Sequence, residues 1–181
     1  AYRKELALHG KTPDEMKPVV RITTSDTGSG GANIFPMLVS GKENTTISLG
    51  SPLRLGHRNG TKLSEFDDQL KLLYGKYQLA AGNLVKLLKI EVMNPVNCMK
   101  GVMDKLGIAR KYAAEAVDLF RAQYGEDPCT AHDIYFGISE ILYMLACEGE
   151  EGGRIARMEE TIARALSVNW TEFDIPGAYK W

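Results

Sequence analysis

The chain has 181 residues, of which 44% are hydrophobic and 25% are charged. This length and composition are typical of one globular domain that buries a core without disulfides or metal ions, so we expect residues 1–181 to form a single domain. No apolar stretch approaches the ~18 residues needed to cross a bilayer, and the first residues lack the apolar run of a signal peptide. We therefore expect a cytoplasmic protein.

The formal net charge of −1 is unevenly distributed along the sequence. Residues 1–62 carry nine Lys or Arg against five Asp or Glu, whereas residues 111–181 carry six against thirteen. A basic segment of this kind indicates a surface that binds a polyanion. The alternative stays open that acidic surface helices simply follow a near-neutral sheet, because charged runs are often solvated faces.

The first third of the sequence predicts short strands separated by turns. Residues 19–24 are mostly β-branched and favour a first strand, and residues 32–39 favour a second. The Ser, Asp and Gly residues at 25–31 are typical of a turn. Because Pro36 has no N–H to donate, we expect the second strand to lie at a sheet edge or to be bulged there.

Two more short strands are predicted at 45–49 and 53–55, ahead of a tight turn at Asn59-Gly60. Lys and Arg on such a strand and turn bind phosphates by charge, although they also protect an edge strand from aggregation. Few aromatic residues lie among these cations, which favours a duplex backbone over single-stranded bases as the partner. The candidate residues for binding a nucleic acid or another partner are Lys11, Lys17, Arg21, Arg54, His57, Arg58 and Lys62.

Residues 64–89 predict a long helix, because apolar residues recur there every three or four positions. Ser64 and Asp67 have the spacing of a capping box at its start. The apolar stripe is typical of core packing, but it also fits a seam between two helices, so a dimer through this helix stays open. Gly75 and Gly82 weaken the helix by about 1 kcal/mol each and leave room for another backbone.

Further helices are predicted behind this one. Asn94-Pro95 marks a helix start, with Asn94 as its cap, and Gly107 marks the end of that helix. Another helix spans about 109–124, and a last one spans about 154–166. Between these two, Thr130 and Asp133 form a second capping box.

The helix that follows Thr130 carries apolar residues around much of its circumference, which predicts burial on more than one side. The tail contains three apolar anchors, Trp170, Phe173 and Ile175, and is expected to dock on the body of the protein. The expected fold is α+β, with a small antiparallel N-terminal sheet packed against about five C-terminal helices.

The sequence contains no catalytic signature. The glycine-rich run at 28–31 lacks the lysine and the following helix of a nucleotide-binding loop. Cys129 and His132 have the spacing of two zinc ligands, but zinc needs three or four convergent ligands. We predict no catalytic residue, no metal and no cofactor, and hence no enzyme, while an active site dispersed along the sequence stays open.

The cysteines Cys98, Cys129 and Cys147 are odd in number and form no Cys-x-x-Cys pair. Small secreted domains instead carry dense, even sets of cysteines. We therefore expect three reduced thiols, each at least partly buried.

Several segments of the sequence stand out, namely the strand and turn at 22–30, Phe35-Pro36, the turn at 57–60, residues 163–166, and Trp170 with residues 173–177. Together they resemble a family of phage- and plasmid-borne proteins of unknown function. Two features depart from that family, because Thr27 interrupts the turn and the second strand lacks an Arg-Val-Val-Cys-like continuation. The resemblance implies an origin on a mobile genetic element.

In length and overall sequence the chain also resembles type II anti-CRISPR proteins. This resemblance implies an inhibitor that binds an RNA-guided type II CRISPR effector nuclease in the bacterial host cytoplasm. It assigns no role to individual residues, and an affinity for double-stranded DNA would be supplied by the basic first third. The alternatives are a phage or plasmid DNA-binding accessory protein in recombination or replication, and an unrecognised nuclease.

Overall fold

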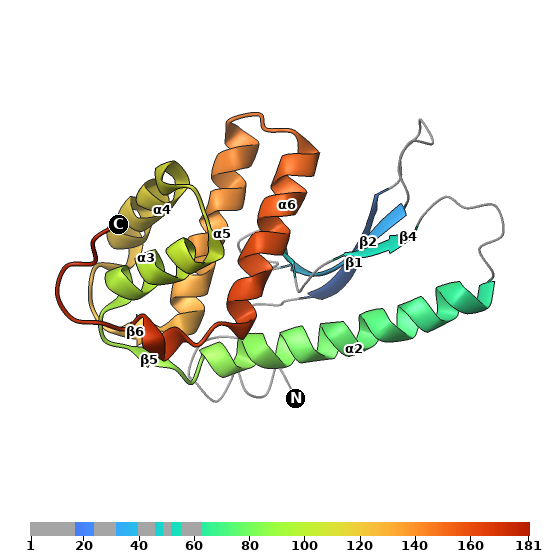
Figure 1. Cartoon of the computed structure of the whole chain (residues 1–181), viewed down its shortest axis with the longest axis horizontal. Coiled ribbons are helices and arrows are strands. Elements are labelled where there is room, and N and C mark those ends of the chain that lie inside the picture. The colour runs from blue at the N-terminus through green and yellow to red at the C-terminus, as the bar shows by residue number, and fades with distance from the viewer. Residues whose placement is uncertain (1–16, 24–31, 40–45, 49–51, 56–62) are drawn as a thin grey trace.

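The structure is a computed structural model that describes residues 17–23, 32–39, 46–48, 52–55 and 63–181. It confirms the α+β fold, with a small antiparallel sheet near the N-terminus and helices behind it (Figure 1). The strands are β1 (Lys17–Thr23), β2 (Ala32–Val39), β3 (Thr46–Ser48), β4 (Leu53–Leu55), β5 (Glu91–Val92) and β6 (Cys129–Thr130). The helices are α2 (Leu63–Leu87), α3 (Pro95–Leu106), α4 (Arg110–Tyr124), α5 (Ala131–Cys147) and α6 (Gly152–Ala163), followed by the 3₁₀ turns η1 (Arg164–Ser167) and η2 (Trp170–Glu172).

Strand β2 lies in the middle of the larger sheet, so the expectation that Pro36 places this strand at an edge is wrong. β1 pairs with β2 along its whole length, in continuous register and without a bulge. On the opposite side, β4 pairs with residues 32–34 and β3 pairs with residues 37–39. Pro36 therefore lies where the ladder on that side is already interrupted, and a missing donor there breaks no bond with β3 or β4.

The two faces of this sheet pack against different helices. Phe35 and Met37 are buried on the face that looks toward α6, and Met37 pairs with Ser48 of β3, a strand that contacts α6. Ile34 points the other way and forms a small cluster with Leu53 and with Leu73 of α2. Strand alternation explains this division, because successive side chains point to opposite faces.

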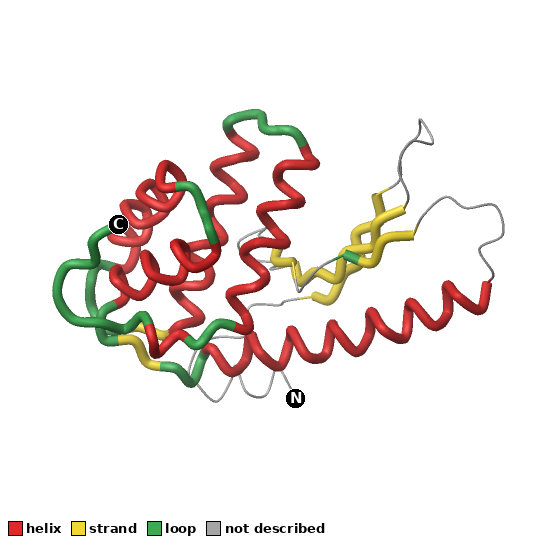
Figure 2. Tube along the Cα trace, viewed as in Figure 1, coloured by secondary structure: helices red, strands yellow, loops and turns green. Residues whose placement is uncertain are grey.

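Helix α2 links the sheet to the remaining helices. Figure 2 shows it running beneath the sheet and on to the base of the helical bundle. Leu73 packs against the sheet, whereas Ala80, Leu84 and Leu87 belong to the main core. The predicted stripe is thus confirmed as core packing at Leu73, Ala80 and Leu84, and also at Leu88 just beyond the helix.

Two details predicted for α2 differ in the structure. The helix begins at Leu63, so Ser64 lies in its first turn and not before it. No other described segment of the chain packs closely against Gly75 or Gly82, because a Cβ atom at either position would meet nothing within 4 Å.

The remaining helices surround one large core, which we call the helical body (α3 to α6 with η1 and η2). Its largest fully buried side chains include Trp170, Tyr135 and Phe120. α5 has buried residues on several sides, as predicted, and it packs so closely on α4 that a Cβ at Gly137 would lie 2.6 Å from Phe120. The short β5–β6 ladder was not predicted, and it joins the segment before α3 to the segment before α5.

The predicted helix boundaries in the body are largely confirmed. α3 begins with Pro95 and ends at Gly107, whose φ of 73° is left-handed, a conformation that glycine adopts without a Cβ clash. Thr130 and Asp133 form the predicted capping box of α5. Asn94 precedes α3 as predicted, but its side chain accepts no hydrogen bond from the helix.

No helix among the described residues has both the length and the apolar character needed to cross a membrane. None of the three cysteines, which all lie in the described part of the chain, forms a disulfide bond. Cys98 is buried and Cys129 is partly buried, as expected, but Cys147 is exposed at the end of α5, so the expectation of burial is wrong for that residue.

Candidate partner-binding surface

Two of the candidate binding residues have described side chains, Arg21 in β1 and Arg54 in β4. Lys17 begins β1, where only the backbone is described. The other four candidates lie outside the described residues, namely Lys11, His57, Arg58 and Lys62.

Arg21 forms a two-pronged ion pair with Glu159 of α6. Its Nη1 donates to Glu159 Oε1 at 3.0 Å, and its Nη2 donates to Oε2. The guanidinium also lies 4.5 Å from the centre of the Phe35 ring. Glu159 is one of the few buried charged residues of the described chain, with 4% of its surface exposed. This pair therefore fastens the sheet to α6 from inside the protein.

Arg54 makes the neighbouring contact on the same sheet face. Its Nη2 lies 2.9 Å from Oε1 of Glu160, the residue after Glu159 on α6. β1 and β4 flank β2 on opposite sides, so the two consecutive glutamates reach across the central strand. The sequence analysis did not single out either glutamate, because this juxtaposition depends on how α6 packs on the sheet. The available signal was the acidic excess of the C-terminal part.

Apolar side chains are exposed on the opposite face of the sheet and on α2. The exposed fractions are 56% for Val20, 63% for Ile22, 58% for Leu72 and 66% for Leu79. Val20 and Ile22 are two residues apart and share one face of β1, and Leu72 and Leu79 are seven residues apart and share one side of α2. We call these four residues the extension surface. Monomeric proteins seldom leave large apolar side chains grouped in water.

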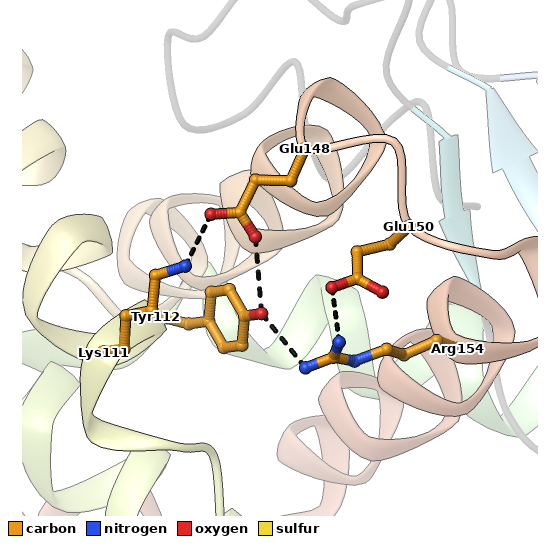
Figure 3. A network of polar contacts seen from close by, with 5 residues as sticks. All are labelled: Lys111, Tyr112, Glu148, Glu150 and Arg154. Carbon is orange, nitrogen blue, oxygen red and sulfur yellow. Dashed lines mark hydrogen bonds and ion pairs between the residues drawn. The ribbon is translucent and has the colours of Figure 1, made fainter.

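A polar network joins the start of α4 to the α5–α6 loop, as Figure 3 shows. Lys111 Nζ lies 2.7 Å from Glu148 Oε1, and the Tyr112 hydroxyl donates to Glu148 Oε2 at 3.4 Å. Arg154 donates to the Tyr112 oxygen at 3.1 Å and pairs with Glu150. The hydrogen bond from Lys111 is the main cause that lowers the pKa of Glu148. Each charged residue of this network has a partner within it, so the network holds the start of α4 against the α5–α6 loop.

The C-terminal tail docks on α3 as predicted, but Ile175 is 47% exposed, so only Trp170 and Phe173 of the three expected anchors pack against the core. Trp170 is fully buried, and Asp174 accepts hydrogen bonds from the backbone N–H groups of Met93 and Asn94 and from the Asn94 side chain. Asp174 thus fastens the tail to the two residues that precede α3. Asn97 Nδ2 donates to the carbonyl oxygens of Ile175 and Gly177.

A half-open cavity of about 360 Å³ lies between the tail, the start of α3 and the end of α4. Its polar side chains are already engaged within the protein. Asn97 binds the tail, Arg121 pairs with Glu126 at 2.8 Å, and Lys100 lies 5.5 Å from the Trp181 ring centre. Few polar groups are left to select a small ligand, so this cavity is a weaker candidate site than the extension surface.

The possible zinc ligands do not converge within the described chain. Asp133 serves in the capping box, and the His132 ring lies 4.6 Å from that of Phe136. No group of three His, Cys, Asp or Glu residues that could hold a metal ion occurs among the described residues.

Comparison with known proteins gives no relative from which a role could be transferred. No protein-family model, no curated protein and no solved structure matches this chain.

Proposed function

We propose that this chain is a non-enzymatic inhibitor that binds a type II CRISPR effector nuclease by direct contact and blocks DNA targeting. The nuclease as partner follows from the resemblance to type II anti-CRISPR proteins. The observation that carries binding to a protein is the extension surface, where four large apolar side chains are more than half exposed.

The chemistry of the extension surface favours a protein partner over a nucleic acid. Burying a side chain such as Leu or Ile stabilises a complex by about 1.5–3 kcal/mol relative to leaving it in water. Phosphates offer no apolar surface to gain that energy, whereas protein interfaces have apolar centres. The arginines lie on the other face of the sheet and already have carboxylate partners, so a duplex contact there is an accompanying property in this proposal.

The direct experiment is co-purification with a type II effector loaded with its guide RNA, together with a DNA cleavage assay. We expect a stable complex and slower cleavage. The variants Leu72→Ser and Leu79→Ser are expected to weaken binding about tenfold or more each, because each removes a large apolar contact. The matched control is Tyr143→Ser, since Tyr143 is 69% exposed but lies on α5, away from the extension surface.

Each alternative has its own outcome in this experiment. If no nuclease is captured and cleavage is not slowed, the proposal fails. A DNA-binding accessory protein would instead bind a duplex with an affinity that falls steeply with salt. An unrecognised nuclease would degrade DNA or RNA in the presence of a divalent metal ion.

A further inference from the structure

The ion pairs between the sheet and α6 differ in how far water reaches them. In the inner pair, the side chains of Arg21 and Glu159 are 37% and 5% exposed. In the outer pair, the side chains of Arg54 and Glu160 are 69% and 24% exposed. The buried Glu159 therefore holds one end of the inner pair within the protein, while Arg54 stands at the surface with the Glu160 carboxylate in front of it.

A carboxylate on a guanidinium occupies the position that a phosphate takes in a nucleic-acid complex. A carboxylate and a phosphodiester each present two negatively charged oxygens side by side, and the guanidinium binds either pair through the same N–H groups. Arg54 Nη2 already donates to Glu160 Oε1 at 2.9 Å. A phosphate arriving at Arg54 must replace this contact or share the group with it.

We infer that Glu160 acts as an internal substitute for a phosphate, so that the backbone of a nucleic-acid duplex binds Arg54 only by displacing this carboxylate. The inference deepens the duplex-binding part of the proposed function and rests on it. The inner pair keeps α6 on the sheet during the exchange, because Glu159 is buried and bound through both oxygens.

The energies make this exchange responsive to salt. An exposed ion pair stabilises a protein by about 0.2–1 kcal/mol, so its loss opposes binding only weakly. A phosphate contact releases condensed counterions, which contributes most at low salt. Glu160 therefore lowers the affinity of a duplex without abolishing binding.

The test is the variant Glu160→Gln, which keeps the size of the side chain and removes its charge. We expect its affinity for a DNA duplex of about 20 base pairs to rise about two- to fivefold at low salt, as expected for the loss of an exposed ion pair. In both proteins the duplex contacts Arg54, so the slope of log affinity against log salt should change little. The double variant Glu160→Gln/Arg54→Gln should lose the gain in affinity, and its slope should flatten by about 0.9, the value for one lost phosphate contact.

The matched control is Glu115→Gln, which removes the same charge from an exposed position on α4. An equal gain in affinity for both single variants would mean that the change in overall charge explains the effect, and it would overturn the inference. The absence of a gain for both variants would overturn it as well. Thermal unfolding of Glu160→Gln should stay close to that of the unchanged protein, because the inner pair is intact. An RNA duplex of the same length shows whether the gain is restricted to DNA or belongs to any phosphodiester backbone.

These measurements also separate the inference from the proposed function, because duplex binding and nuclease inhibition are assayed independently. A gain in duplex affinity with no inhibition of the nuclease supports the inference and contradicts the function. Inhibition of the nuclease without a gain in duplex affinity supports the proposed function and contradicts the inference.

Discussion

At the scale of single residues, polar side chains reach across long stretches of sequence to close this fold. Asp174 lies about 80 positions along the chain from Met93 and Asn94, the residues before α3, and it accepts three hydrogen bonds from them. Partial burial acts to raise its pKa, but these hydrogen bonds outweigh that effect and lower the pKa below its ordinary value of 3.8. The folded protein therefore favours the ionised form of this carboxyl group.

Replacing Asp174 by Ala should lower the free energy of unfolding by about 1–3 kcal/mol, because Met93 and Asn94 lose a charged hydrogen-bond acceptor. Asp174→Asn should recover part of the loss. A folded pKa below the unfolded one contributes stability above the unfolded pKa, and this contribution is lost as pH falls through the folded value. Urea unfolding should thus show the difference between the unchanged protein and Asp174→Ala shrinking as pH falls below 3.8. A difference that does not change with pH would contradict the role of the carboxylate.

Tyr135 is the opposite case, a buried hydroxyl with no hydrogen-bond partner among the described residues. Burial raises the pKa of this phenol, so it stays neutral and desolvated. Tyr135→Phe should therefore stabilise the protein by up to about 1 kcal/mol, because it removes an unsatisfied polar group and keeps the ring.

Thermal unfolding checks this prediction for Tyr135, and Tyr112→Phe is its control. The Tyr112 hydroxyl bonds Glu148 and Arg154, so its removal should lower Tm. A similar fall in Tm for both variants would show that Tyr135 has a partner after all.

At the scale of elements, close packing depends on two glycines on helices. Gly101 of α3 lies against Phe173 of the tail, and a Cβ there would come within 2.6 Å of the Phe173 ring. Gly137 of α5 plays the same part toward Phe120 of α4. Glycine lowers the helix propensity at both positions, but it allows Phe173 and Phe120 to pack directly against the helix backbone.

Gly101→Ala should destabilise the protein by about 1–3 kcal/mol, because the new methyl group pushes Phe173 and the docked tail away. Gly75→Ala is the matched control on α2, where a Cβ meets nothing within 4 Å. That change should instead stabilise the protein by up to about 1 kcal/mol through helix propensity. Chemical denaturation of both variants tests the pair, and an equal effect at the two positions would contradict the packing argument.

At the scale of the whole molecule, the sheet and the helical body have cores of very different size. Among the described residues, the cluster beneath the sheet contains Ile34, Leu53 and Leu73, whereas the body buries a large continuous set that includes Trp170 and Tyr135. Burial of apolar surface is the main source of stability, so the two parts are expected to open at different free energies.

Hydrogen exchange should show this difference directly. Amide groups of β2 and β4 should exchange through openings that cost less free energy than those that expose the middle of α5. Mass spectrometry of exchanged peptides under native conditions measures both regions in one sample. Equal protection of β2 and α5 would mean that the molecule opens as one unit. Addition of the proposed nuclease partner should raise protection in β1 and in the middle of α2, around Leu72 and Leu79.

How much of this structure could be predicted depends on the range of the interactions involved. Features that depend on a few neighbouring residues are confirmed. They are the start of α3 at Pro95, the capping box at Thr130 and the end of α3 at Gly107. The place of β2 in the sheet was wrong, because strand order depends on partners far along the chain. The contacts of Glu159, Glu160 and Asp174 were missed for the same reason.

The sequence by itself determined the α+β class, most of the helices and strands, and the core side of α2, because helix and strand periodicity act over a few residues. Only the tertiary structure decided that the arginines of the basic strands face carboxylates of α6, and that Val20, Ile22, Leu72 and Leu79 remain in water. The physical reason is that exposure and pairing of a side chain depend on what the rest of the chain places over it. Local pattern alone does not contain that information.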